Sequence, residues 1–170
     1  VRYNTDGSLD STFDGDGIVT TNFGTAFQYA FAVEIQPADG KVVVAGTSWS
    51  GVSRIALARY NTNGSLDTSF DGDGKVVTAT GAGTTISGQG QGNLRIQSDG
   101  KIVVAGNSEA GGESVIALVR YNIDGSLDAG FGPSAIFMSR DVAVPEGNAG
   151  TTDAVFTVTR LKGVVTTNWG

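Results

Sequence analysis

Oxygen-bearing side chains recur at alternate positions in three short segments of the chain, and a glycine follows the middle residue of each. The sets are Asn4, Asp6 and Asp10, then Asn61, Asn63 and Asp67, then Asn122, Asp124 and Asp128. Calcium binds carboxylate and amide oxygens spaced in this way, and the glycine permits the sharp turn of such a loop. The three segments are therefore candidate calcium sites.

An arginine stands where a calcium loop carries its first ligand, at Arg2, Arg59 and Arg120. A guanidinium there would repel the cation. An alternative needs no metal: the middle residue accepts hydrogen bonds in an Asx turn, and the last Asp caps the next turn or pairs with the arginine. The sequence leaves both interpretations open.

Two further glycine-rich loops carry pairs of carboxylates two residues apart. They contain Asp14 and Asp16, then Asp71 and Asp73. These pairs are a second candidate calcium site. The alternative is that their charges are solvated and protect the edge of a sheet.

The residue types present in the chain exclude several kinds of catalytic site. The chain has no His and no Cys, so it lacks the usual activated nucleophiles and the usual zinc or copper ligands. Paired carboxylates could hydrolyse glycosides, but these Asp residues recur in every repeat, whereas a catalytic pair would be unique. We expect no enzymatic activity and no cofactor apart from possible Ca²⁺.

The oxygen-rich segments belong to a longer repeat that starts near residues 2, 59 and 120, at spacings of 59 − 2 = 57 and 120 − 59 = 61. Residues 41–46 likewise return as residues 101–106. A period of this size accommodates about four short strands and their turns. Such a unit cannot bury its apolar face alone, so neighbouring units must stack.

Alternating apolar residues and turn signals place the strands that position these segments. Asp39-Gly40 and Asp99-Gly100, each followed by an apolar run, predict hairpins. We expect loops at 47–53, 79–92 and 107–114. The predicted strands cover residues 17–21, 30–36, 41–45 and 55–60, and in the next unit residues 74–78, 94–96, 101–105 and 115–121.

Aromatic residues recur once per unit, and we expect them in the core between units rather than in a ligand-binding row. They are Tyr3, Tyr60 and Tyr121, with Phe13, Phe70 and Phe131. Trp49 has no counterpart in the second unit. In its expected loop it could contact a sugar or a protein, or fold back on the loop.

Composition limits the partners. The net charge is −6 and the sequence pI about 4.4, which disfavours nucleic acid and anionic membranes. No apolar run reaches the roughly 20 residues that span a bilayer. With 26 Gly and few helix formers, the chain is typical of an all-β protein.

The motif Arg-Tyr-Asn-x-Asp-Gly-Ser-Leu-Asp, followed by Asp-Gly-Lys-Val-Val-Val-Ala-Gly, resembles the delta-60 repeat of bacterial exported and surface proteins over residues 2–131. This resemblance implies a β-propeller-like array of four-stranded blades. The oxygen-rich segments are also similar to the calcium loops of integrin-type propellers, apart from the arginine. The repeat pattern stops after Phe131, where Gly-Pro-Ser replaces Asp-Gly-Asp-Gly.

Residues 142–170 resemble the opening of a Calx-beta domain, an immunoglobulin-like sandwich. The expected organisation is a repeat region at 1–132, a linker at 133–141 and this partial segment at 142–170. Two strands would leave an apolar face open, so Phe156 and Val158 are candidate interaction residues, packing on the repeats or on another chain.

The sequence thus predicts an all-β protein of tandem four-stranded blades with an immunoglobulin-like strand segment at its C-terminal side. We expect a structural or interaction module of a large bacterial secreted or cell-surface repeat protein, for adhesion or scaffolding, whose partners are other blades, copies of the chain, or a surface glycan or protein. One alternative is a subunit that assembles into a ring or filament through open repeat ends and a donated strand. Another is a calcium-binding propeller module.

Overall fold

The computed structural model describes residues 1–79, 93–110 and 113–131, together with short strands at 84–85, 137–138, 154–160 and 163–169. Side chains are described within 1–79, 93–108 and 115–131. Apart from one 3-10 turn, η1 (Ala129–Phe131), the regular elements of these residues are strands, which confirms the all-β prediction. None of the described residues forms a helix long and apolar enough to cross a membrane.

The first sheet is a four-stranded antiparallel blade with its strands in chain order. It consists of β1 (Phe27–Ile35), β2 (Val42–Trp49), β3 (Ser53–Tyr60) and β4 (Lys75–Thr78). Gly40 has φ +72° in the turn between β1 and β2, a conformation that favours glycine. This sheet agrees with the predicted four-stranded unit.

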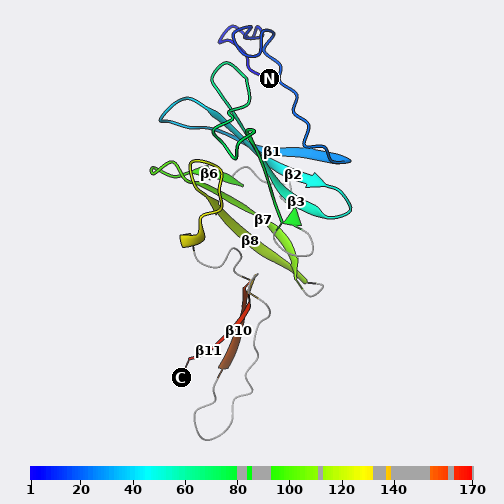
Figure 1. Cartoon of the computed structure of the whole chain (residues 1–170), viewed down its shortest axis with the longest axis vertical. Helices are drawn as coiled ribbons and strands as arrows, with labels where there is room; N and C mark the ends of the chain where they lie inside the picture. The colour runs from blue at the N-terminus through cyan, green and yellow to red at the C-terminus, as the bar shows by residue number, and fades with distance from the viewer. Residues whose placement is uncertain are drawn as a thin grey trace, which may run out of the picture.

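The second sheet lies beside the first (Figure 1) and is built around β7. Its elements are β5 (Thr84–Thr85), β6 (Leu94–Ile96), β7 (Ile102–Ala110) and β8 (Glu113–Tyr121). Both β5 and β6 pair with β7, at Ser108 and Val104 respectively, while β8 takes the other edge. Among the described strands this sheet is therefore three strands wide.

A third sheet contains β9 (Phe137–Met138), β10 (Ala154–Arg160) and β11 (Gly163–Trp169), in the order β11-β10-β9. The β9 strand falls within the expected linker. Phe156 and Val158 belong to β10, and their side chains lie outside the described residues, as do all of residues 142–153. The Calx-beta resemblance and the role of these two residues stay predictions.

Two strand assignments and two loop assignments from the sequence were wrong. Residues 17–21 form no strand, and β4 is the last strand of the first sheet rather than the first strand of the next unit. The turn after Tyr60 returns the chain along β3, which explains that order. The expected loops at 47–53 and 107–114 are shorter, because β2 continues to Trp49 and β7 to Ala110.

The core lies between the two blades. One face of the first sheet contributes Val43, Ala45, Ile55, Leu57 and Val76, together with Phe70, and the facing side of the second sheet contributes Leu94, Ile102, Val104, Val119 and Tyr121. Tyr121 and Phe70 are both fully buried, which confirms that these repeated aromatics are core residues. Tyr3 differs, because 62% of its surface is exposed.

Candidate functional site

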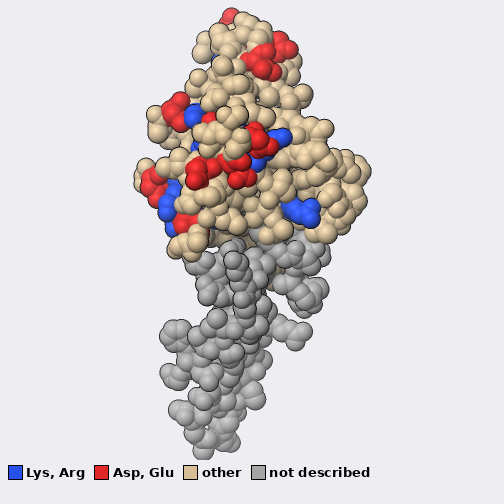
Figure 2. All heavy atoms as spheres, in the orientation of Figure 1, with Lys and Arg blue, Asp and Glu red and all other residues tan. Residues whose placement is uncertain are grey.

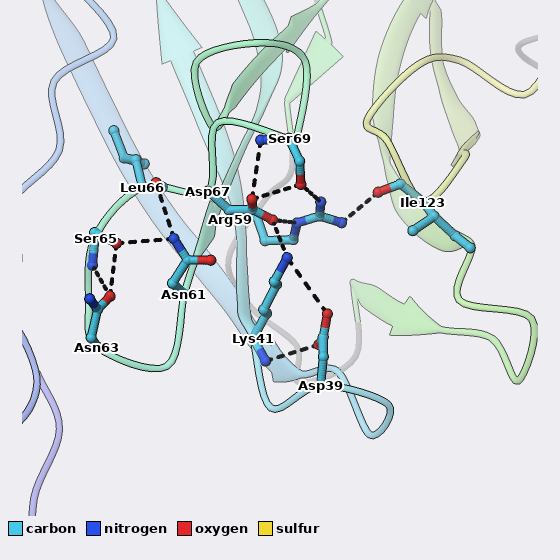
Figure 3. Close-up of polar contacts among 10 residues, drawn as sticks. All are labelled: Asp39, Lys41, Arg59, Asn61, Asn63, Ser65, Leu66, Asp67, Ser69 and Ile123. Atoms are coloured by element: carbon cyan, nitrogen blue, oxygen red, sulfur yellow. Dashed lines mark hydrogen bonds and ion pairs between the residues drawn. The ribbon is translucent and has the colours of Figure 1, made fainter.

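A polar cluster around the buried residues Arg59 and Asp67 lies where the turn after β3 meets the hairpin between β1 and β2. We call Lys41, Arg59, Asp67 and Ser69 the Arg59 cluster (Figure 3). Asp67 Oδ2 accepts hydrogen bonds from Arg59 Nε at 2.6 Å and Lys41 Nζ at 2.9 Å. Its Oδ1 accepts from the Ser69 backbone N at 3.1 Å and hydroxyl at 2.7 Å. Both carboxylate oxygens are therefore satisfied, as burial requires.

Arg59 links this cluster to the following repeat. Its side chain is only 3% exposed, and Nη1 donates to the carbonyl of Ile123, in the turn after β8 (Figure 3). The guanidinium lies over the Phe70 ring, 4.5 Å from its centroid. The backbone N of Asp71 also donates to the Asp124 carbonyl at 2.8 Å. These polar contacts and the apolar core connect the same two blades.

The same arrangement recurs in the other two repeats with less burial. Arg2 donates to Asp10 at 2.7 Å and Arg120 to Asp128 at 2.8 Å. Lys101 donates to Asp128 at 2.9 Å, matching Lys41 in the Arg59 cluster. Each arginine lies over the phenylalanine of its repeat, at 4.6 Å for Phe13 and 4.2 Å for Phe131. The predicted pairing of the repeated Asp with the repeated arginine is confirmed in all three units.

The middle residues of the oxygen-rich segments form the Asx turns of the metal-free alternative. Oδ1 accepts from the backbone N two residues later, at 3.0 Å in Asp6, 3.1 Å in Asn63 and 3.0 Å in Asp124. The preceding Asn residues, Asn4, Asn61 and Asn122, each donate to the serine hydroxyl of the same turn at 3.0 Å. Ordinary turn chemistry thus occupies these side chains.

The second set of candidate ligands is likewise divided between turns. Asp14 and Asp71 have positive φ, at 55° and 52°. Asp16 and Asp73 accept from the backbone N of Ile18 and Lys75, at 2.8 and 2.9 Å. Within the described part of the chain, no three Asp or Glu side chains are grouped so that they could hold a metal. Calcium binding stays a prediction from the sequence.

Sequence reasoning missed the two lysines that pair with the repeated carboxylates. Lys41 and Lys101 follow the Asp-Gly hairpin turns, and their recurrence was visible, but nothing in the sequence indicated that they would reach Asp67 and Asp128 across 26 and 27 residues.

Trp49, expected in a loop, is the last residue of β2 and is 39% exposed. Its ring lies 5.4 Å from that of Phe27.

The repeated carboxylates remain ionised to low pH because cationic and N–H donors surround them. The hydrogen bond from Lys101 is the main reason that the pKa of Asp128 falls to about 2. For Asp67, burial opposes ionisation, but hydrogen bonds from Lys41, Ser69 and Arg59 outweigh it and hold the pKa below its ordinary value. Burial also raises the pKa of Tyr121, whose hydroxyl donates to Thr78 Oγ1 at 2.8 Å.

Lowered carboxyl pKa values give stability a defined pH dependence. The unfolded chain takes up these protons near pH about 3.9, and the folded chain only nearer the pKa of about 2 for Asp128. Stability is therefore complete above about pH 4 and falls as the pH drops towards about 2. We expect urea midpoints to decline over that window, and to decline less steeply in Asp128→Asn. An equally steep decline in the variant would show that Asp128 is not responsible.

Gly7 and Gly64 have the same repeat position, but only Gly64 lies close to the backbone of an adjacent repeat. A Cβ at Gly64 would lie 2.8 Å from the Asp14 backbone N, whereas one at Gly7 would meet nothing within 4 Å. Both residues have positive φ, at +91° and +86°, so alanine strains each by roughly 1–2 kcal/mol. We expect Gly64→Ala to reduce the urea midpoint further than Gly7→Ala, because it also separates two repeats. Equal losses would mean that the close approach contributes nothing.

Comparison with known protein families supports the repeat organisation. A family described as a domain of unknown function (DUF5122) beta-propeller matches residues 1–13, 38–70 and 97–131. Each matched piece ends at the repeated phenylalanine of its unit, and the second and third include the Asp-Gly turns that precede Lys41 and Lys101. The match is consistent with a propeller-like repeat family. No curated protein and no solved structure is detectably similar to the chain.

Proposed function

We propose that this chain is a non-catalytic structural and interaction module of a large bacterial repeat protein, exported to the cell surface or secreted. The proposal depends mainly on the contacts of the repeated charged residues, which pair with one another within a repeat and hydrogen-bond to the next repeat. Asp10, Asp67 and Asp128 each pair with the arginine of their own repeat, and Arg2 and Arg59 also donate to a carbonyl of the following repeat. Side chains in such pairs serve to join blades.

The resemblance to the delta-60 repeat supports export, because that family occurs in bacterial exported and surface proteins. The charge distribution agrees with the proposed partners. On the face displayed in Figure 2, Asp and Glu side chains gather among fewer Lys and Arg. Nucleic acids and anionic lipids bind basic surfaces, so we propose other blades, proteins or surface glycans as partners.

The test of this function is where the protein is found. We expect an antibody raised against the folded chain to label intact cells of the source bacterium, with a cytosolic protein as the unlabelled control. Labelling that needs permeabilised cells would contradict the proposed surface role. Detection only in the culture medium would support the secreted form.

Trp49 and Phe27 support a contact surface on the first blade. They are 39% and 55% exposed and lie ring to ring at the end of β2 and the start of β1. An amphipathic exposed indole is suited to sugar or protein contact. Trp49→Ala should weaken binding of cell-surface extract to the immobilised chain, with Val52→Asp, a nearby loop variant, as the control. Unchanged binding would show that Trp49 is not part of the proposed contact surface.

Calcium binding is the second proposal, and calorimetry tests it directly. Titrating calcium into chelator-treated protein should give heat and raise the melting temperature if the oxygen-rich turns bind the ion. Asp6→Asn should then reduce both effects. No heat and no change in melting temperature would contradict calcium binding.

A further inference from the structure

Each blade has a face formed by the same repeat positions, and this face is buried on the second blade but exposed on the first. On the second blade, Leu94 and Val104 are 1% and 0% exposed, because the first blade covers them. Val33, at the repeat position of Leu94, is 67% exposed, and its neighbour Ile35 is 62% exposed. The apolar residues of this face are thus present without the covering that their counterparts have.

A hollow of about 840 Å³ lies over that exposed face. Its lining includes Val33, Val42, Val44 and Tyr60 from the first blade, and Val19 and Thr21 from the N-terminal segment. On the second blade, the positions equivalent to Val42 and Val44 pack into the core. The hollow therefore corresponds in the repeat to the volume that the first blade fills above the second.

The N-terminal segment already occupies one strand position of a covering blade. Thr21 Oγ1 lies 2.6 Å from the Tyr60 hydroxyl, as Thr78 Oγ1 lies 2.8 Å from that of Tyr121. Thr78 belongs to β4, which pairs with β3, but residues 18–21 belong to no strand. Among the described residues, 18–21 therefore lack a partner strand equivalent to β3.

We propose that the hollow is the seat of a three-stranded antiparallel sheet from a further repeat of the same kind, whose third strand pairs with residues 18–21. Its inward face would carry aliphatic residues at the positions of Val43, Ala45, Ile55 and Leu57, which cover the second blade in this structure. The inference rests on the proposed function only in treating the chain as part of a repeat array. It adds the surface, the partner and the register.

The test supplies the missing strands. Because Val1 has the repeat position of Ala58, a second copy of residues 22–57 placed ahead of Val1 would complete a blade over the hollow. Val33→Asp is made at the residue that lines the hollow, not in the added copy. We expect it to leave the melting temperature of the original chain unchanged and to lower that of the extended chain by several degrees. Val52→Asp, made once in the same loop of both chains, is the control and should behave alike in both.

Three outcomes would overturn the proposal. The first is an equal effect of Val33→Asp in both chains. The second is an added segment that limited proteolysis shows to be unfolded. The third is self-association of the original chain, seen by light scattering and abolished by Val33→Asp, which would make a second copy the occupant. None of these outcomes depends on where the protein is found in the cell, so failure here is distinguishable from failure of the proposed function.

Discussion

Asp67→Ala is expected to lower the free energy of unfolding by about 3–5 kcal/mol, the cost of leaving one partner of a buried ion pair without the other. Arg59 would keep its charge with 3% of its side chain exposed and lose its carboxylate partner, and Lys41 would keep only the longer contact with Asp39, at 3.8 Å. Because small proteins have only about 5–15 kcal/mol of stability in total, urea denaturation should show a large fall in midpoint.

The matched control for this change is Asp10→Ala in the first repeat. The pair of Arg2 and Asp10 has the same geometry, but the Arg2 side chain is 33% exposed and can be hydrated. We expect a much smaller fall in midpoint, because exposed ion pairs contribute little. Similar losses in the two variants would show that burial of Arg59 does not set the cost.

Ile55→Ala should destabilise the protein by about 2–5 kcal/mol, while Ile116→Ala should change its stability by less than about 0.5 kcal/mol. The two isoleucines have the same repeat position, but Ile55 is fully buried between the blades and Ile116 is 71% exposed. Truncating the first leaves a cavity between the sheets, whereas truncating the second leaves none. Thermal or urea unfolding of both variants measures the difference.

A loss in Ile116→Ala as large as that in Ile55→Ala would contradict the assignment of the core to the interface of these two blades. The comparison is stringent because both residues are isoleucines at the same repeat position of equivalent strands, β3 and β8. Only the neighbouring blade differs.

Much of the fold could be predicted from the sequence because the repeat and the alternation of apolar residues are local signals. The Asp39-Gly40 and Asp99-Gly100 turns correctly predicted the hairpins of β1 with β2 and of β6 with β7. Strand order was less accessible. Residues 74–78 read as a strand, but whether they begin one sheet or finish another depends on pairing with β3, which no local pattern encodes.

The site was predicted in part for the same reason. The Asx turns and the pairing of Asp67 with Arg59 join residues close in sequence, and the Asn-x-Asn-Gly pattern indicated them. Lys41 comes from another hairpin, and the carbonyl of Ile123 lies in the next repeat, so both contacts depend on how the blades stack. Long-range packing also decides that Ile55 is buried while Ile116 is exposed.

Native-state hydrogen exchange tests the central claim most directly, namely that the interface core and the Arg59 cluster unite the two blades in one folding unit. The slowest amides of β2 and β3 and those of β7 and β8 should report the same opening free energy, and Asp67→Ala should lower both values together. Separate opening energies for the two sheets, with the variant affecting only the first, would contradict the claim.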